Sequence, residues 1–129
     1  MNKAQALQSF WSSFGIPAVD EQSAYDDMTM EALGNPAMYI TYEVQTSNLG
    51  EPTALTASIW KRSTTWAAVQ EKADEIAAYI GWGGKVLPID GGYLWVKLRQ
   101  PFAQRIFTDQ DDSIRRMYLN ISVDYLTAT

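Results

Sequence analysis

The sequence predicts an α+β domain in which two helices pack on one face of a largely antiparallel sheet, built from two hairpins and a C-terminal strand. Two segments repeat apolar residues at helical spacing, two pairs of strand-like segments are joined by turn residues, and one long alternating segment follows. The 129 residues, 47% of them hydrophobic, suffice for one ordinary core and leave little for a second. We therefore expect a single domain over residues 1–129.

The first helix is predicted near the N-terminus. Apolar residues recur there at i, i+3, i+4 and i+7 and share one stripe: Leu7, Phe10, Trp11 and Phe14. Gly15, with Pro17 shortly after it, predicts the end of this helix. Polar residues interrupt the segment from Met1 to Ile16, so we expect a soluble chain with neither a signal peptide nor a membrane span.

The segment from Ile16 to Met38 is irregular and acidic, which predicts a surface excursion rather than another core element. We expect its part from Val19 to Glu31 to be weakly packed until a neighbour covers it. No Lys or Arg occurs between Lys3 and Lys61, although seven Asp and Glu residues do, and the net charge of the chain is −5. This charge disfavours sequence-independent binding of nucleic acid.

The segments from Tyr39 to Thr46 and from Thr53 to Arg62 predict the first hairpin, joined through Ser47 to Pro52. The first segment is rich in aromatic and β-branched residues. The second alternates, which is typical of a strand with two different faces. One face carries Leu55, Ala57 and Ile59, and the other carries Thr56, Ser58 and Trp60.

The second helix is predicted after Ser63, Thr64 and Thr65, which offer N-caps. Its apolar stripe repeats at helical spacing: Trp66, Val69, Ala73, Ile76, Ala77 and Ile80. The glycines at 81, 83 and 84 predict its end. They do not match a phosphate-binding loop, because they follow a helix and Lys85 is followed by Val86 instead of Ser or Thr.

The second hairpin is predicted from Lys85 to Ile89 and from Tyr93 to Arg99, because Asp90, Gly91 and Gly92 between them supply the positive φ angles of a tight turn. A long alternating strand is predicted from Ile114 to Leu126. The side expected to face the core carries Met117, Leu119, Ile121, Val123 and Tyr125. The side expected to face solvent carries Arg116, Tyr118, Asn120, Ser122 and Asp124.

The chain contains no histidine and no cysteine, the residues most used for acid-base, nucleophilic and transition-metal chemistry. Glu71 and Glu75 fit the polar face of the second helix, and Ser58 and Lys61 would point to opposite faces of a strand. The acidic residues at 109–112 lack the glycine and terminal glutamate of a calcium-binding loop. We therefore expect no catalytic residue, no cofactor and no metal.

The segment from Pro101 to Asp112 is predicted as a loop that touches a neighbouring subunit. It holds large apolar residues among charged ones, a mixture that a protein interface uses and that folding alone explains poorly. The predicted interface residues are Phe102, Gln104, Arg105, Phe107, Asp111 and Asp112. The alternative is that Phe102 covers the edge of the sheet and the charges are solvated.

Five segments together resemble the tail terminators, a group among the small neck and tail proteins of long-tailed phages and prophages of Gram-positive bacteria. These segments are Tyr39 to Val44, Ile59 to Trp66, Asp90 to Trp95, Pro101 to Arg105 and Asp111 to Arg116. The resemblance spans nearly the whole chain and is strongest from Trp60 onward. The segment from Ala18 to Met38 is the least similar.

The resemblance implies a virion structural protein that forms a ring, commonly a hexamer, on the last ring of the tail tube. Such a ring stops tube growth and docks the head-side connector or stopper protein, while DNA passes through it without specific binding. It would lie in the virion neck at the top of the tail, after assembly in the host bacterial cytoplasm, with no membrane partner. The alternatives are another neck protein, such as a stopper or head-completion protein, and a monomeric ligand-binding module or an enzyme using Asp and Tyr.

Overall fold

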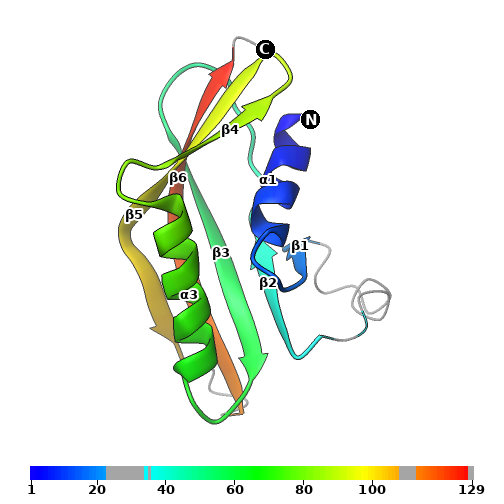
Figure 1. Cartoon of the computed structure of the whole chain (residues 1–129), viewed down its shortest axis with the longest axis vertical. Helices are drawn as coiled ribbons and strands as arrows, with labels where there is room; N and C mark the ends of the chain where they lie inside the picture. The colour runs from blue at the N-terminus through cyan, green and yellow to red at the C-terminus, as the bar shows by residue number, and fades with distance from the viewer. Residues whose placement is uncertain (23–33, 35, 108–112, 128–129) are drawn as a thin grey trace.

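The computed structural model describes residues 1–22, 34, 36–107 and 113–127 (Figure 1). Its elements are, in order, α1 (Lys3–Ser12), β1 (Ala18–Asp20), β2 (Met38–Tyr42), β3 (Thr53–Arg62), α3 (Ala67–Ile80), β4 (Lys85–Ile89), β5 (Gly92–Ile106) and β6 (Ile114–Thr127). The strands form one sheet in the order β1-β2-β3-β6-β5-β4, in which only the β1–β2 pair is parallel. Both helices lie on the same side of this sheet, so the predicted α+β class is confirmed.

The last strand of the described chain, β6, lies at the centre of the sheet. It pairs with the whole of β3, from Thr53 opposite Val123 to Arg62 opposite Ile114, and with both halves of β5. The predicted core face is confirmed, since all five of its residues are at most 3% exposed: Met117, Leu119, Ile121, Val123 and Tyr125. The residues between them are half-buried on the opposite face.

The predicted first helix is confirmed as α1. Asn2 caps it, because its side chain accepts a hydrogen bond from the Gln5 amide and the Gln5 side chain accepts one from the Asn2 amide. The four residues of the predicted stripe are all buried. The helix contacts both β1 and β4, the two edge strands, and so bridges the two edges of the curled sheet.

The second predicted helix is confirmed as α3, and its residues Val69, Ala73, Ile76 and Ile80 are buried. The predicted N-caps are wrong: Trp66 occupies the cap position and no side chain caps the helix there. The Ser63 hydroxyl accepts a hydrogen bond from the Thr65 amide instead, because a hydroxyl also satisfies a local turn two residues ahead.

The aromatic ring of Tyr79 joins the two helices. It lies 5.3 Å from the Phe14 ring in an edge-on arrangement and 6.1 Å from the Phe10 ring. The Lys72 ammonium donates a hydrogen bond to the Phe14 carbonyl oxygen at 2.8 Å and so fixes the end of α1 against α3.

The prediction of an irregular excursion is wrong at Ala18–Asp20, which forms β1. This strand pairs in parallel with β2, Ala18 opposite Ile40, and a three-residue parallel strand leaves no alternating pattern to recognise. Most of the Val19–Glu31 segment, residues 23–31, lies outside the described residues, so its expected weak packing stays a prediction. The first hairpin is confirmed, although β2 ends at Tyr42 rather than at Thr46.

The prediction of a loop from Pro101 onward is also wrong, because β5 continues to Ile106. The pairing shifts between Leu98, opposite Ile121, and Ala103, opposite Leu119, so that residues 99–102 of β5 correspond to the single residue Asn120 of β6. The Asn120 amide nitrogen donates to the Pro101 carbonyl oxygen at 3.0 Å and holds this bulge. A bulge accommodates a proline without ending the strand.

Candidate functional site

The face of the sheet opposite the helices carries no helix of the described chain. Across four strands of this open face, Tyr39 stands opposite Trp60, Trp60 opposite Arg116, and Arg116 opposite Ile106. Tyr118 follows Arg116 by two residues and therefore points the same way. We call Tyr39, Trp60, Arg116 and Tyr118 the aromatic–arginine row.

Contacts within the row keep it in place. The Arg116 guanidinium lies 4.7 Å from the centre of the Trp60 ring and 5.4 Å from that of Tyr118. The Tyr39 and Trp60 rings stack at 6.4 Å, inclined by 15°. Preordered aromatic and arginine side chains lose little conformational entropy on binding and are common anchors of protein interfaces.

Two buried hydroxyl groups support the row from the sheet below it. The Arg116 Nε atom donates to the Ser58 hydroxyl at 3.0 Å, and the Trp60 Nε1 atom donates to the Thr41 hydroxyl at 2.9 Å. Ser58 and Thr41 are 3% and 7% exposed. Ser58 thus supports an arginine, and Lys61 lies on the other face of the sheet, which confirms that the two side chains point to opposite faces.

A second apolar cluster covers the other end of the open face. Val86 stands opposite Trp95, and Tyr93 stands between Pro88 and Leu126. Val86, Tyr93 and Leu126 are between 41% and 53% exposed. The open face thus carries aromatic side chains at both ends, in the aromatic–arginine row and in this cluster.

Trp82 is the most exposed large side chain of the described residues, at 104% of the reference area. It follows α3 and precedes Gly83, whose carbonyl oxygen accepts a hydrogen bond from the Trp95 Nε1 atom at 3.0 Å. Nothing in the described fold packs on this indole, although an exposed tryptophan costs free energy in water. Trp82 therefore resembles an interface anchor more than a structural residue.

The structure separates the predicted interface residues. Phe102 is half-buried and packs against the core, which agrees with the alternative that it covers the sheet. Gln104 lies on the open face opposite Tyr118, whereas Arg105 lies on the helix side opposite Met117. Phe107 is 73% exposed. Asp111 and Asp112, like Asp109, lie outside the described residues.

Arg105 has contacts within its own chain. Its guanidinium lies 5.3 Å from the centre of the Trp66 ring, and its Nη2 atom donates to the Gln70 Oε1 atom at 3.4 Å. Arg115 lies over the same ring at 5.4 Å. Trp60 and Arg116 are not among the predicted interface residues, although the alternation of their strands places both on faces opposite the apolar residues.

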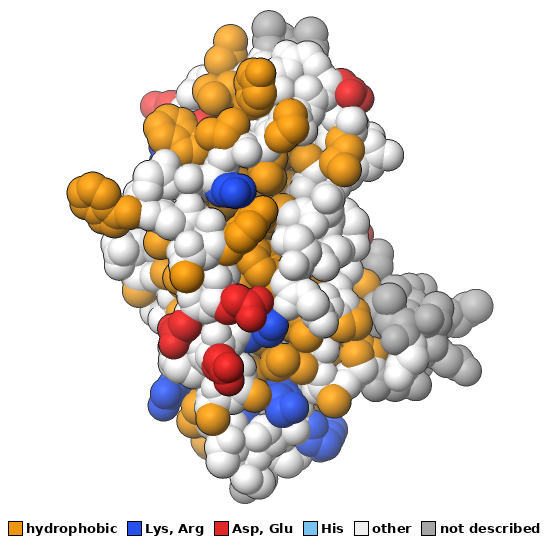
Figure 2. All heavy atoms as spheres, viewed as in Figure 1, with side chains coloured by type: hydrophobic (Ala, Val, Ile, Leu, Met, Phe, Trp, Pro, Cys, Tyr) orange, Lys and Arg blue, Asp and Glu red, His pale blue; other side chains and the backbone are white. Residues whose placement is uncertain are grey.

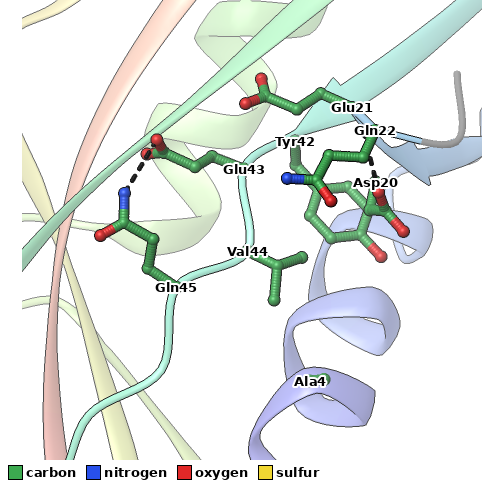
Figure 3. Close-up of a pocket in the computed structure, with 8 residues that line it drawn as sticks. All are labelled: Ala4, Asp20, Glu21, Gln22, Tyr42, Glu43, Val44 and Gln45. Atoms are coloured by element: carbon green, nitrogen blue, oxygen red, sulfur yellow. Dashed lines mark hydrogen bonds between the residues drawn. The ribbon is translucent and has the colours of Figure 1, made fainter. Parts of the chain in front are cut away.

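A polar hollow lies between α1 and the ends of β1 and β2 (Figure 3). It is lined by Ala4, Asp20, Glu21, Gln22, Tyr42, Glu43, Val44 and Gln45. The Glu43 carboxylate accepts hydrogen bonds from the Gln45 side chain and the Thr56 amide. In Figure 3 the Asp20 carboxylate points away from those of Glu21 and Glu43. Among the described residues, no three acidic, histidine or cysteine side chains are placed to hold a metal ion.

Burial raises the pKa of the Glu21 carboxyl, and the Glu43 and Asp20 carboxylates raise it further, while the Arg116 guanidinium lowers it. The raised pKa thus has a general electrostatic cause and does not single out Glu21 as a catalytic acid. Glu71 and Glu75 are exposed on α3, as expected for its polar face.

The Tyr42 hydroxyl donates a hydrogen bond to the Gln8 side chain of α1, and the Tyr125 hydroxyl donates one to the Gln45 carbonyl oxygen in the loop after β2. Burial raises the pKa of each of these two tyrosines to about 12.

The unfolded chain, with a tyrosine pKa near 10, would lose the Tyr42 and Tyr125 hydroxyl protons first, so the free energy of unfolding should fall as the pH rises from 10 to 12. In an alkaline absorbance titration, Tyr42→Phe and Tyr125→Phe should each remove one late-ionising tyrosine. A titration curve unchanged by either substitution would contradict this assignment.

Comparison of the chain with protein-family models, curated proteins and solved structures found no match. No helix within the described ranges has the length and apolar character needed to cross a membrane.

Proposed function

We propose that this chain is the ring-forming subunit of a tail terminator in a long-tailed phage or prophage. The ring would end growth of the tail tube and dock the head-side connector or stopper protein. The observation that carries the proposal is the aromatic–arginine row, an ordered set of anchors on a sheet face that no described helix covers. The sequence resemblance supports the neck position and a hexamer.

The distribution of exposed apolar residues also favours a repeating assembly. A ring subunit needs two different surfaces, because each copy meets one neighbour with one surface and the other neighbour with the second. Two further apolar side chains lie outside the open face: Trp82, fully exposed after α3, and Phe107, largely exposed after β5. The net charge of −5 suits a channel through which DNA passes without binding.

The test uses the purified full chain and tail tubes assembled from the tube protein. We expect rings by negative-stain electron microscopy, tube ends capped by these rings, and tubes that stop growing when the chain is added. Binding to filled heads in preference to tubes would support a stopper or head-completion protein instead. A monomer that binds neither would contradict the proposal and favour a ligand-binding module.

Phe107 offers a test of the predicted interface that does not disturb the fold. Its side chain is 73% exposed, so Phe107→Ser should change the free energy of unfolding by less than about 0.5 kcal/mol. Loss of an aromatic anchor should raise the concentration needed for ring formation or tube capping by roughly tenfold. The assay is light scattering across a concentration series, followed by microscopy of the tubes.

Leu49→Ser is the matched control, since Leu49 is 62% exposed in a different part of the chain. Phe102→Ala and Arg105→Glu would be poorer tests, because Phe102 packs on the core and Arg105 lies over Trp66. Equal assembly by the Phe107 and Leu49 variants would show that Phe107 is not in the interface.

A further inference from the structure

We infer that neighbouring subunits pack front to back, with the outer stripe of α3 in one copy lying on the aromatic–arginine row of the next copy. This inference rests on the proposed ring. A second copy of this chain thus occupies the open face. The contact joins the helix side of one subunit to the open face of its neighbour.

The outer stripe of α3 consists of Ala67, Glu71, Asp74 and Ala78, which recur at helical spacing and are all exposed. Figure 2 shows acidic side chains gathered over α3 on this side of the molecule. The two alanines allow close approach of another backbone, and the two carboxylates give the stripe negative charge. Trp82 lies just beyond the end of the stripe and adds an exposed aromatic anchor.

The open face provides complementary charge. Arg116 lies at the centre of the row, and Arg62 is exposed on the same face two residues from Trp60. Two guanidinium groups therefore face the partner's two carboxylates, Glu71 and Asp74, beside aromatic rings that can pack against Trp82. Arginine pairs with carboxylates through directed hydrogen bonds, which would fix the register of the contact.

The dimensions of the two surfaces also agree. The 14-residue α3 is about 21 Å long, from a rise of about 1.5 Å per residue. The row and its neighbours cross the strands β2, β3, β6 and β5, which at about 4.8 Å spacing span roughly 15–19 Å with their side chains. The two surfaces lie on opposite sides of one sheet, so their contact repeats head to tail, as a ring requires.

Charge reversal gives a specific test with the full chain. The stripe variant replaces the two acidic residues of the α3 stripe, Glu71→Arg and Asp74→Arg. The open-face variant replaces the two arginines, Arg62→Glu and Arg116→Glu. Each alone should lose ring formation by at least roughly tenfold, because like charges then meet at every contact. Mixed at equal concentration they should assemble again, because every contact between unlike variants pairs opposite charges.

The mixture has a second expected signature. Rings made of alternating variants must contain an even number of subunits with equal numbers of each variant. Native mass spectrometry, with one variant isotopically labelled, reads this composition directly. A chain carrying all four reversals should also form rings.

Several controls keep the result interpretable. Glu51→Arg reverses an exposed charge outside both surfaces and should assemble like the wild type. Since Arg116 contacts Ser58 and two rings, Arg62→Glu alone provides a milder form of the open-face variant. Circular dichroism checks that each variant is folded. Trp82→Ala should weaken assembly without loss of stability, because its side chain is fully exposed.

The outcomes separate this inference from the proposed function. Wild-type rings together with normal assembly of either charge variant, or loss in both variants without recovery on mixing, would overturn the front-to-back contact and leave the ring proposal intact. A wild-type chain that forms no ring and caps no tube would overturn both. Open-face variants that form rings but no longer cap tubes would assign this face to the tube protein instead.

Discussion

Replacing Leu119 or Ile121 with alanine is expected to lower the free energy of unfolding by about 2–5 kcal/mol. Both side chains are 0% exposed and lie on the central strand β6, under the helices. Their truncation would remove apolar contacts and leave a cavity that a strand paired on both sides cannot close. Urea unfolding followed by circular dichroism measures the change, and the melting temperature should fall by on the order of 10 °C.

Ser122→Ala is the control for this prediction, because Ser122 lies on the same strand and its side chain points to the open face. We expect a cost below about 1 kcal/mol, because this small, half-buried polar side chain lies outside the core. A change at Asn120 should also be milder than one at Leu119, although Asn120 holds the bulge through Pro101. Equal losses at Ser122 and Leu119 would contradict the assignment of the two faces.

Replacing Gly84 with alanine is expected to cost roughly 2–4 kcal/mol. Gly84 has a φ of +84°, which strains any residue with a Cβ atom. A Cβ atom there would also lie 2.5 Å from the Trp95 Nε1 atom and 2.7 Å from the Val96 carbonyl oxygen. The second contact is with strand backbone, so relief requires β5 to move. Chemical denaturation of the variant tests this expectation.

Gly83 is the matched control, one residue away in the same turn. A Cβ atom at Gly83 would have no neighbour within 4 Å. Gly83→Ala should therefore change stability by no more than about 0.5 kcal/mol. If the two alanine variants were equally stable, the close approach of the turn to β5 would be wrong.

The helices and the longest strands were predictable because their signals are local. The stripe of α1, the stripe of α3 and the alternation of β6 each lie within one segment, and burial selects the same residues that periodicity selects. The turn at Gly91 was also predictable, since its φ of +78° is the conformation that Asp-Gly sequences favour.

The missed features depend on contacts between distant segments. β1 exists because β2 pairs with it, and β5 continues past Pro101 because Asn120 and the following strand residues hold the bulge. Neither pairing leaves a pattern in its own segment. Proline is also an ambiguous signal, because it ends a strand in some places and occupies a bulge in others.

The candidate site was predictable only in part for the same reason. Alternation placed Trp60 and Arg116 on faces opposite the apolar residues of their strands, but their contact depends on β3 lying next to β6. Tyr39 joins them through a further strand pairing. The predicted loop, in contrast, was chosen from composition within one segment, and the pleat of β5 separates Gln104 from Arg105.

The central position of β6 has a consequence for biogenesis. The strands made earlier form two groups in the sheet, β1-β2-β3 and β5-β4, and β6 is the described strand that pairs with both groups. A nascent chain that has reached residue 113 therefore exposes apolar faces on both groups and must wait for β6 before its core can close. Chains truncated before β6 should therefore aggregate or be degraded in the cell, so early termination should leave no folded fragment of the domain.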